Sequence, residues 1–247
     1  MDFYAFAPVA AILDIAYAGL TAFISLITPF AGDFAAALGI VALTLVVRLA
    51  LIPVGRSQVR AEFTRKRLAP KLEALKRRYG KKPEVLQQKT LELYRDEKAS
   101  PFAGFLPALA QAPVLSIVYG LFIVAVINGH ANDLLGAHFF GVSLGTSLVS
   151  GAAGWPGILV FVGLLVVIGV VAWISRRVAL NFATPVDDAA PGAAMAQSLA
   201  RWLSWLPFIT VIFASLVPLA ATIYLTVTTT WTLVERVILR RVMAPTE

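Results

Sequence analysis

The sequence predicts an all-α integral membrane protein with a five-transmembrane-helix core, a cytoplasmic helical hairpin and an N-terminal interfacial amphipathic helix. Three observations predict this fold class. Of the 247 residues, 59% are hydrophobic and the mean hydropathy is +0.80, whereas soluble domains are roughly 45–50% apolar. Several apolar runs are long enough to cross a bilayer. Finally, 14 of the 21 lysines and arginines are confined to the segment from Arg56 to Lys98.

The first 33 residues are expected to be extracytoplasmic and to contain one helix. Within residues 9–28 apolar side chains recur at helical spacing, while Asp14 and Thr21 fall away from the centre of the stripe. This one-sided pattern favours an amphipathic helix lying in the membrane interface. A spanning helix is the alternative, because the length suffices. Pro29 and Gly32 then break the helix.

The first predicted span, residues 34–54, contains an arginine. An ionised guanidinium at membrane depth costs about 2.5–3.5 kcal/mol, and arginine cannot lose its proton to avoid that cost. We expect no acid within the spans to neutralise Arg48, because Asp33 and Glu235 lie at span ends and Glu235 adjoins the tail arginines. Arg48 should therefore face water, and a groove open to the cytoplasm is the simplest solution.

Residues 55–100 are predicted to form the basic helical hairpin. Leu68, Leu72 and Leu75 form an apolar seam in the first half, a Gly-Lys-Lys-Pro turn begins at Gly80, and the second half again has helical spacing. Pro70 should kink or restart the first helix. Between Arg56 and Lys98, 14 basic and six acidic residues leave eight net positive charges.

The rest of the chain alternates between apolar runs and loops, and its charges predict the topology. Basic residues fill the hairpin, the linker and the tail, but are absent from the N-terminal region and the loop at 128–156. The positive-inside rule therefore places the N-terminus outside and the C-terminus in the cytoplasm. The last two spans could instead form one long kinked helix. The predicted segments are a second span at 101–127, an extracytoplasmic loop at 128–156, a third span at 157–175, a cytoplasmic linker at 176–201, a fourth span at 202–218, a fifth span at 219–238 and a cytoplasmic tail at 239–247.

Composition and motifs argue against several function classes. With no cysteine, the chain has no disulfide, thiolate metal ligand or thiol nucleophile. His130 and His138 lie beside Asp133, where a hydrated loop is favoured over a metal site. No catalytic motif is present, so we expect neither an enzyme nor a cofactor. The pI near 9.9 reflects topology and attraction to anionic lipids, not DNA binding. No cleavable signal peptide is expected.

The residue order resembles the YidC/Oxa/Alb membrane protein insertases. The resemblance rests on Arg48 followed by Ile52-Pro53, on LAPKLEALKRRYG in the hairpin, and on the run LELYRDEKASPFAGFLPALAQAPVLSIVYGLF. The segment LPFITVIFASLVPLAATIYLTVTTTW is similar to the last two spans of that family. The resemblance runs from about residue 34 to 241, and it identifies the chain as a short bacterial member.

The resemblance implies a membrane insertase and chaperone with a hydrophilic groove open to the cytoplasm. In that family the arginine matched by Arg48 receives polar or acidic parts of the substrate, and Thr44 lines the same groove. Tyr224 matches the aromatic residue after the proline of the last span, while Leu225 replaces a second aromatic residue. For each Ser or Thr, hydrogen bonding between helices is the alternative role. The candidate groove residues are Arg48, Thr44, Gln111, Ser116, Thr222, Tyr224 and Thr228.

The expected partners follow from the same resemblance. They are nascent membrane proteins, the ribosome, the Sec translocon and anionic lipids, at the bacterial plasma (inner) membrane. A small solute transporter or channel, and a tether for ribosomes or membrane complexes, are the rival functions. The hairpin residues expected to contact the ribosome or lipid are Arg65, Lys66, Arg67, Lys71, Lys76, Arg77, Arg78, Lys81 and Lys82.

Overall fold

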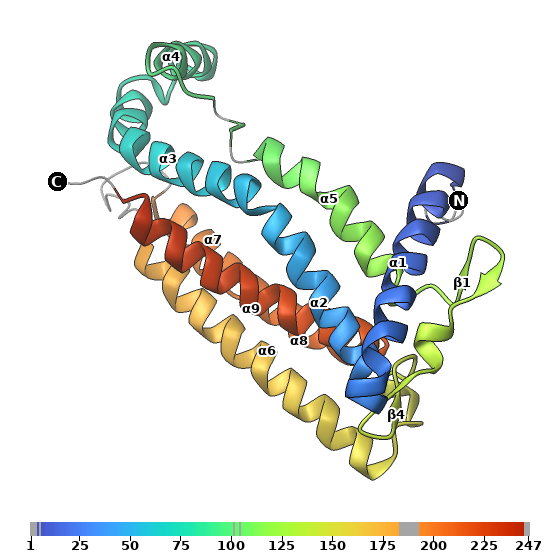
Figure 1. The fold of residues 1–247 in the computed structure, drawn as a ribbon. Helices are drawn as coiled ribbons and strands as arrows, with labels where there is room; N and C mark the ends of the chain where they lie inside the picture. Colours follow the sequence, from blue (N-terminus) through green and yellow to red (C-terminus); the bar gives the residue numbers. More distant parts are fainter. Residues whose placement is uncertain (1–3, 5, 101, 104, 183–192, 245–247) are drawn as a thin grey trace.

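The structure is a computed structural model, and it describes residues 4, 6–100, 102–103, 105–182 and 193–244. This part of the chain is mainly helical, which confirms the predicted class in its coarse form. Figure 1 shows long helices packed side by side, with a helical hairpin at one end and small β-hairpins at the other. The helices are α1 (Ala7–Ala31), α2 (Ala35–Ala50), α3 (Ile52–Tyr79), α4 (Pro83–Asp96), α5 (Phe105–Gly120), α6 (Gly154–Phe182), α7 (Ala193–Leu203), α8 (Leu206–Leu216) and α9 (Leu219–Val242).

Three helical stretches of the described chain are long and apolar enough to cross a membrane. They are Ala7–Ala50, Gly154–Phe182 and Gln197–Leu216. The 16-residue α5 rises ~24 Å, less than the ~30 Å of bilayer hydrocarbon, and α9 ends in a charged segment. The five-span core and its boundaries therefore stay predictions.

Helix α1 packs against α2 and α5, and a short 3₁₀ turn, η2 (Gly32–Phe34), joins α1 to α2. Leu13 and Leu20 of α1 are buried, whereas Ile12 and Ile15 are 50% and 74% exposed. Apolar side chains of α1 therefore lie both against the protein and on its outer surface. The choice between an interfacial and a spanning helix stays a prediction.

The chain passes from α2 into α3 with a single break. Leu51 ends α2, with its amide donating to the carbonyls of Val47 and Arg48, and α3 begins at Ile52. Pro53 lies in the first turn of α3, where its missing N–H removes no helical hydrogen bond. The predicted span boundary at Val54 therefore lies within α3. Helix α3 then continues through Pro70 and packs against α4.

The loop between α5 and α6 holds two antiparallel β-hairpins, which the all-α prediction lacked. Strand β1 (Val126–Ile127) pairs with β2 (His130–Ala131), and β3 (His138–Phe139) pairs with β4 (Val142–Ser143). The turn residues between them, Asn-Gly in the first hairpin and Phe-Gly in the second, all have positive φ. This backbone geometry is typical of tight two-residue hairpins. Two 3₁₀ turns, η3 (Asp133–Gly136) and η4 (Leu148–Ser150), complete the loop.

The C-terminal half departs from the predicted segments at two places. Helix α6 continues past Arg176 and Arg177 to Phe182, so the first part of the predicted linker is helical. Helix α7 occupies the linker's last residues, while residues 183–192 lie outside the described part. Helices α8 and α9 are separate, because Val217 and Pro218 have extended backbone. Leu219 and Ala220 donate hydrogen bonds to Thr146 and Leu144 of the loop, so a single kinked helix is wrong.

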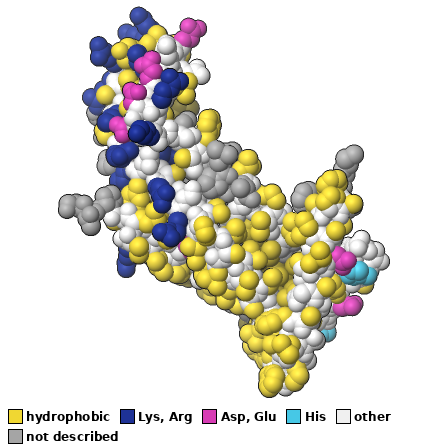
Figure 2. Space-filling view, turned by 45° about the horizontal axis from the view of Figure 1, so that its top comes forward, with side chains coloured by type: hydrophobic (Ala, Val, Ile, Leu, Met, Phe, Trp, Pro, Cys, Tyr) yellow, Lys and Arg dark blue, Asp and Glu magenta, His cyan; other side chains and the backbone are white. Residues whose placement is uncertain are grey.

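The apolar core lies where α1, α2, α5, α9 and the loop meet. Ile40, Phe122, Phe161 and Leu219 are fully buried there, and α9 packs against both α2 and α6. Apolar side chains cover much of the visible surface of the helices, whereas Lys and Arg gather over the hairpin (Figure 2). Large exposed apolar surfaces indicate contact with lipid or protein, and here they surround the long helices.

Candidate functional site

A pocket of about 330 Å³ opens between the α2–α3 junction, α5 and α9. The lining residues of each helix recur at helical spacing, so each helix contributes one of its faces to the pocket. Six of the lining residues are polar or charged, which gives the pocket a mixed character. The α2–α3 wall is Arg48, Leu51, Gly55, Gln58 and Val59; the α5 wall is Gln111, Ala112 and Leu115; the α9 wall is Thr232, Glu235, Arg236 and Leu239.

Arg48 lies at the inner end of this pocket, in the last turn of α2. Its side chain is buried, with 6% of the residue exposed, and its Nε has no hydrogen-bond partner in the described part of the chain. Among the described residues no carboxylate oxygen comes within 4.0 Å of its guanidinium nitrogens. An arginine this buried needs water or a ligand to satisfy its donors, and the open pocket provides space for either.

Glu235, which the sequence places at a span end, lines the same pocket as Arg48, but it forms no ion pair with the arginine within 4.0 Å in the described chain. Within the described chain, the carboxylate makes no ion pair with the tail arginines within 4.0 Å. Its Oε2 accepts a 2.7 Å hydrogen bond from Trp231 Nε1, and its Oε1 is buried with no hydrogen-bond partner among the described residues. A side chain at Gly55 would overlap with Oε1. The absence of a side chain at Gly55 therefore leaves space for the carboxylate between α3 and α9.

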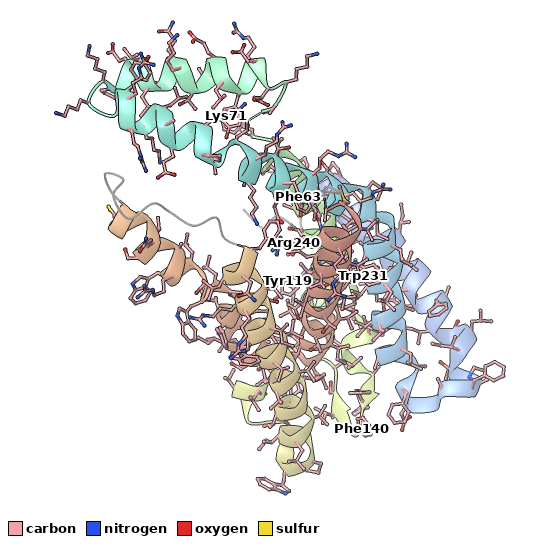
Figure 3. All side chains as sticks on the ribbon, turned by 90° about the vertical axis from the view of Figure 1, so that its left-hand side faces the viewer. Phe63, Lys71, Tyr119, Phe140, Trp231 and Arg240 are labelled. Atoms are coloured by element: carbon pink, nitrogen blue, oxygen red, sulfur yellow. The ribbon has the colours of Figure 1, made fainter. Side chains whose placement is uncertain are left out.

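The tail arginines instead bind Glu62 of α3. Arg240 contacts Glu62 Oε2 at 2.9 Å, and Arg236 lies 3.6 Å from Oε1. Phe182, at the end of α6, lies beneath Arg240 at 3.9 Å and Lys66 at 4.6 Å, measured to the ring centre. Figure 3 shows Arg240 near Phe63, whose ring also packs edge-on against Phe182. These contacts join α3, α6 and α9 beside the pocket.

The predicted groove residues are not all brought together. Arg48 and Gln111 line the pocket, and Gln111 accepts a 3.4 Å hydrogen bond from Gln58 of α3. Thr44 and Thr222 are fully buried, and their hydroxyls donate to Ile40 and Ala214 carbonyls within the protein.

The remaining three groove predictions also lie outside the pocket's lining. The Ser116 carbonyl accepts a hydrogen bond from Tyr4. Tyr224 packs in an aromatic cluster, with ring centres 5.6 Å from Phe122 and 6.0 Å from Tyr119. Thr228 follows Tyr224 by one turn of α9, and its hydroxyl is buried. Five of the seven predicted residues thus lie outside the lining of this pocket.

Four polar lining residues were not predicted from the sequence: Gln58, Thr232, Glu235 and Arg236. Gln58 lies ten residues after Arg48, close to three helical turns, so continuing the helix past Pro53 could have found it. The α9 residues could not be found this way, since their position depends on how α9 crosses α3. Gly55 is the one local signal of that close approach.

The nine predicted hairpin cations are all exposed. Some pair within the hairpin: Arg67 and Lys71 both contact Glu97, and Arg77 contacts Glu73 at 3.6 Å. The hydrogen bond from Lys71 lowers the pKa of Glu97 below its ordinary value. Lys81 and Lys82 lie at the turn, so the hairpin presents its positive charge outward.

At the opposite end of the molecule, α1 is tied to the loop. His130 Nε2 lies 2.8 Å from Asp14 Oδ1, and Asn128 donates to the other carboxylate oxygen at 3.1 Å. The bond to Asp14 raises the pKa of His130 above its ordinary value. In the residues that the structure describes, no three His, Cys, Asp or Glu side chains gather as a metal site would require.

Comparisons with known proteins agree on one family. The family described as "60Kd inner membrane protein" matches residues 26–246. A membrane protein insertase YidC from Cellvibrio japonicus is 37% identical over 112 residues, which is 45% of this chain and 20% of that protein. The YidC of Fusobacterium nucleatum is 31% identical over 105 residues, 42% of this chain and 50% of its own. The chain thus matches half or less of the length of these curated relatives.

Proposed function

Because this chain belongs to the 60Kd inner membrane protein family, we propose that it inserts nascent membrane proteins into the bacterial plasma membrane and helps them fold. Membership confirms the resemblance to the YidC/Oxa/Alb insertases on which this expectation rests. The proposal takes the N-terminus to lie outside the cell and the pocket to open toward the cytoplasm.

One observation carries the proposal: a buried arginine, without an ion-pair partner within 4.0 Å in the described chain, lines an open pocket. A translocated segment exposes backbone and side-chain polar groups that lipid cannot satisfy. A wet pocket with a fixed cation shortens the dry path that such a segment must cross. Arg48 attracts its acidic groups, and the low local dielectric strengthens that attraction. The apolar part of the segment then moves sideways into lipid.

The hairpin gives the proposed insertase its cytoplasmic contacts. Its exposed cations, densest near the turn at Lys81 and Lys82, suit the phosphates of ribosomal RNA and the anionic headgroups of the inner leaflet. We place the ribosome and anionic lipids there, and leave the Sec translocon as a partner that the family resemblance suggests.

Replacing Arg48 tests the function directly. Arg48→Ala should lower insertion of a short single-span substrate by about tenfold or more, since hydrogen bonds to charged groups contribute about 1.5–3 kcal/mol. Arg48→Lys should retain most activity because it keeps the charge. The measurement is protease protection of the substrate's translocated tail in proteoliposomes. Arg56→Ala is the matched control, because Arg56 is exposed on α3 outside the pocket's lining. Equal activity of all variants would reject a charge role for Arg48.

A further inference from the structure

The pocket carries charges of both signs. Arg48 lies on the α2–α3 wall and Glu235 on the α9 wall, yet no oxygen of Glu235 comes within 4.0 Å of the guanidinium nitrogens. If the two opposite charges formed a direct ion pair, neither would be available to bind a substrate group. Here the space between them is part of a cavity of about 330 Å³.

Within the described chain, only one oxygen of the Glu235 carboxylate is hydrogen-bonded. Trp231 Nε1 binds Oε2 at 2.7 Å, while Oε1 is buried and has no hydrogen-bond partner in the described residues. A buried acceptor without a partner is costly, so Oε1 is the pocket atom with the greatest need of a donor. Figure 3 shows Trp231 on α9, below the level of Arg240.

The neighbouring charges do not satisfy Glu235. Arg236 also lines the pocket, but its Nε lies 3.6 Å from Glu62, and Arg240 binds the same acid. The α3 and α5 walls contribute only the amides of Gln58 and Gln111 as polar side chains, and these are hydrogen-bonded to each other. Glu235 is the only carboxylate among the lining residues of this pocket, and one of its oxygens lacks a hydrogen-bond donor within the described chain.

We propose that Glu235 is the acidic half of a two-charge site, which binds the lysine, arginine or ammonium groups of a translocated segment. Arg48 takes the acidic groups, and Glu235 takes the basic ones. Glu235 therefore sets the range of tail charges that the site accepts. This inference rests on the proposed insertase function and names the class of substrate group that one further residue recognises.

The test compares three substrates that differ only in the translocated tail, which carries Asp, Asn or Lys at the same positions. Glu235→Gln keeps the shape and the bond from Trp231 but removes the charge. Insertion of the Lys tail should fall about fivefold, the upper range for a solvated ion pair. Insertion of the Asn tail should not change, and the Asp tail should insert equally well or better. Glu235→Asp should restore part of the Lys-tail insertion.

One further variant tests the same carboxylate, and a second variant controls for the change in net charge. Gly55→Ala places a methyl group against Oε1 and should reproduce part of the Lys-tail loss, while alanine is well tolerated within a helix. Glu92→Gln makes the same change in net charge on α4, outside the pocket's lining, and should leave all three substrates unaffected.

The outcomes separate this inference from the function on which it rests. If Arg48→Ala blocks insertion but Glu235→Gln changes all three tails alike, or none of them, the two-charge site is wrong and the insertase function stands. If Arg48→Ala leaves all three tails inserting normally, the proposed function itself fails.

Discussion

One histidine should make the end of the protein that carries the β-hairpins sensitive to pH. The hydrogen bond between His130 and Asp14 raises the pKa of His130 above 6.5. A group whose folded pKa is raised contributes stability that is fully present below the unfolded pKa, and that contribution is lost as pH rises through the folded pKa. The tie between α1 and the first β-hairpin should therefore be strongest in mild acid.

We expect Asp14→Asn to lower the melting temperature in detergent more at roughly pH 5.5 than at roughly pH 8.5, on either side of the histidine's titration. The effect should be small, because the pair is exposed. His138→Gln, outside this ion pair, should lower stability equally at both pH values, if at all. An Asp14→Asn effect that does not depend on pH would show that the histidine stays neutral.

The sequence predicted two of the six polar or charged residues that line the pocket. Arg48 and Gln111 were both found, because a charge and an amide stand out in apolar runs. Thr44 and Thr222 were also expected at the site, but each hydroxyl binds a carbonyl within the protein. A threonine in a helix can always make such a bond, so sequence does not tell which way its hydroxyl turns.

The hairpin of α3 and α4 has two kinds of stabilising contact, and their magnitudes differ. Leu68 is fully buried, and Tyr94 of α4 is 9% exposed. Glu97 holds Arg67 and Lys71 in exposed ion pairs. Truncating a buried leucine costs about 2–5 kcal/mol, whereas exposed ion pairs contribute about 0–1 kcal/mol. Apolar packing should therefore dominate the stability of the hairpin.

We expect Leu68→Ala to expose α4 to limited proteolysis and to speed amide exchange there, and Glu97→Gln to change both only slightly. Leu91→Ala, at an exposed position of α4, is the matched control for removing a leucine. A hairpin loosened as much by Glu97→Gln as by Leu68→Ala would mean that charge, not packing, holds it.

Helix ends were predicted less well than helix positions. Arg176 and Arg177 predicted the end of an apolar span, but α6 continues to Phe182. The ring of Phe182 contacts Arg240 and Lys66. The two arginines do not end the backbone helix, since long cationic side chains can reach water from within a helix. Similarly, the separation of α8 from α9 depends on hydrogen bonds to the distant loop at Leu144 and Thr146.

At the scale of the whole molecule, the charge distribution gives a clear topology to test. Figure 2 shows Lys and Arg gathered over the hairpin, far from the His and Asp side chains at the other end. The chain has no cysteine, so one introduced thiol is a unique label. Phe140→Cys, at an exposed loop position, should react with an impermeant maleimide added to intact cells. Lys81→Cys should react only after the membrane is opened.

The reverse labelling pattern would overturn the positive-inside assignment. Labelling of both sites from outside would contradict an odd number of spans between residues 81 and 140. The helical class followed from composition, and the hairpin from its periodicity. The side-by-side placement of α9 with α2 and α6 did not, because a sequence without internal repeats carries no signal of which distant helices touch.

The tie of Glu62, Arg240 and Phe182 has a mechanical consequence for the pocket. It joins α3, α6 and α9 through side chains beside the pocket, so two of the three walls are linked to each other. Helix α5 faces these two walls, and the link between pocket side chains across that gap is the 3.4 Å amide contact from Gln58 to Gln111. We therefore expect a guest larger than the resting cavity to move α5 relative to α3 and α9.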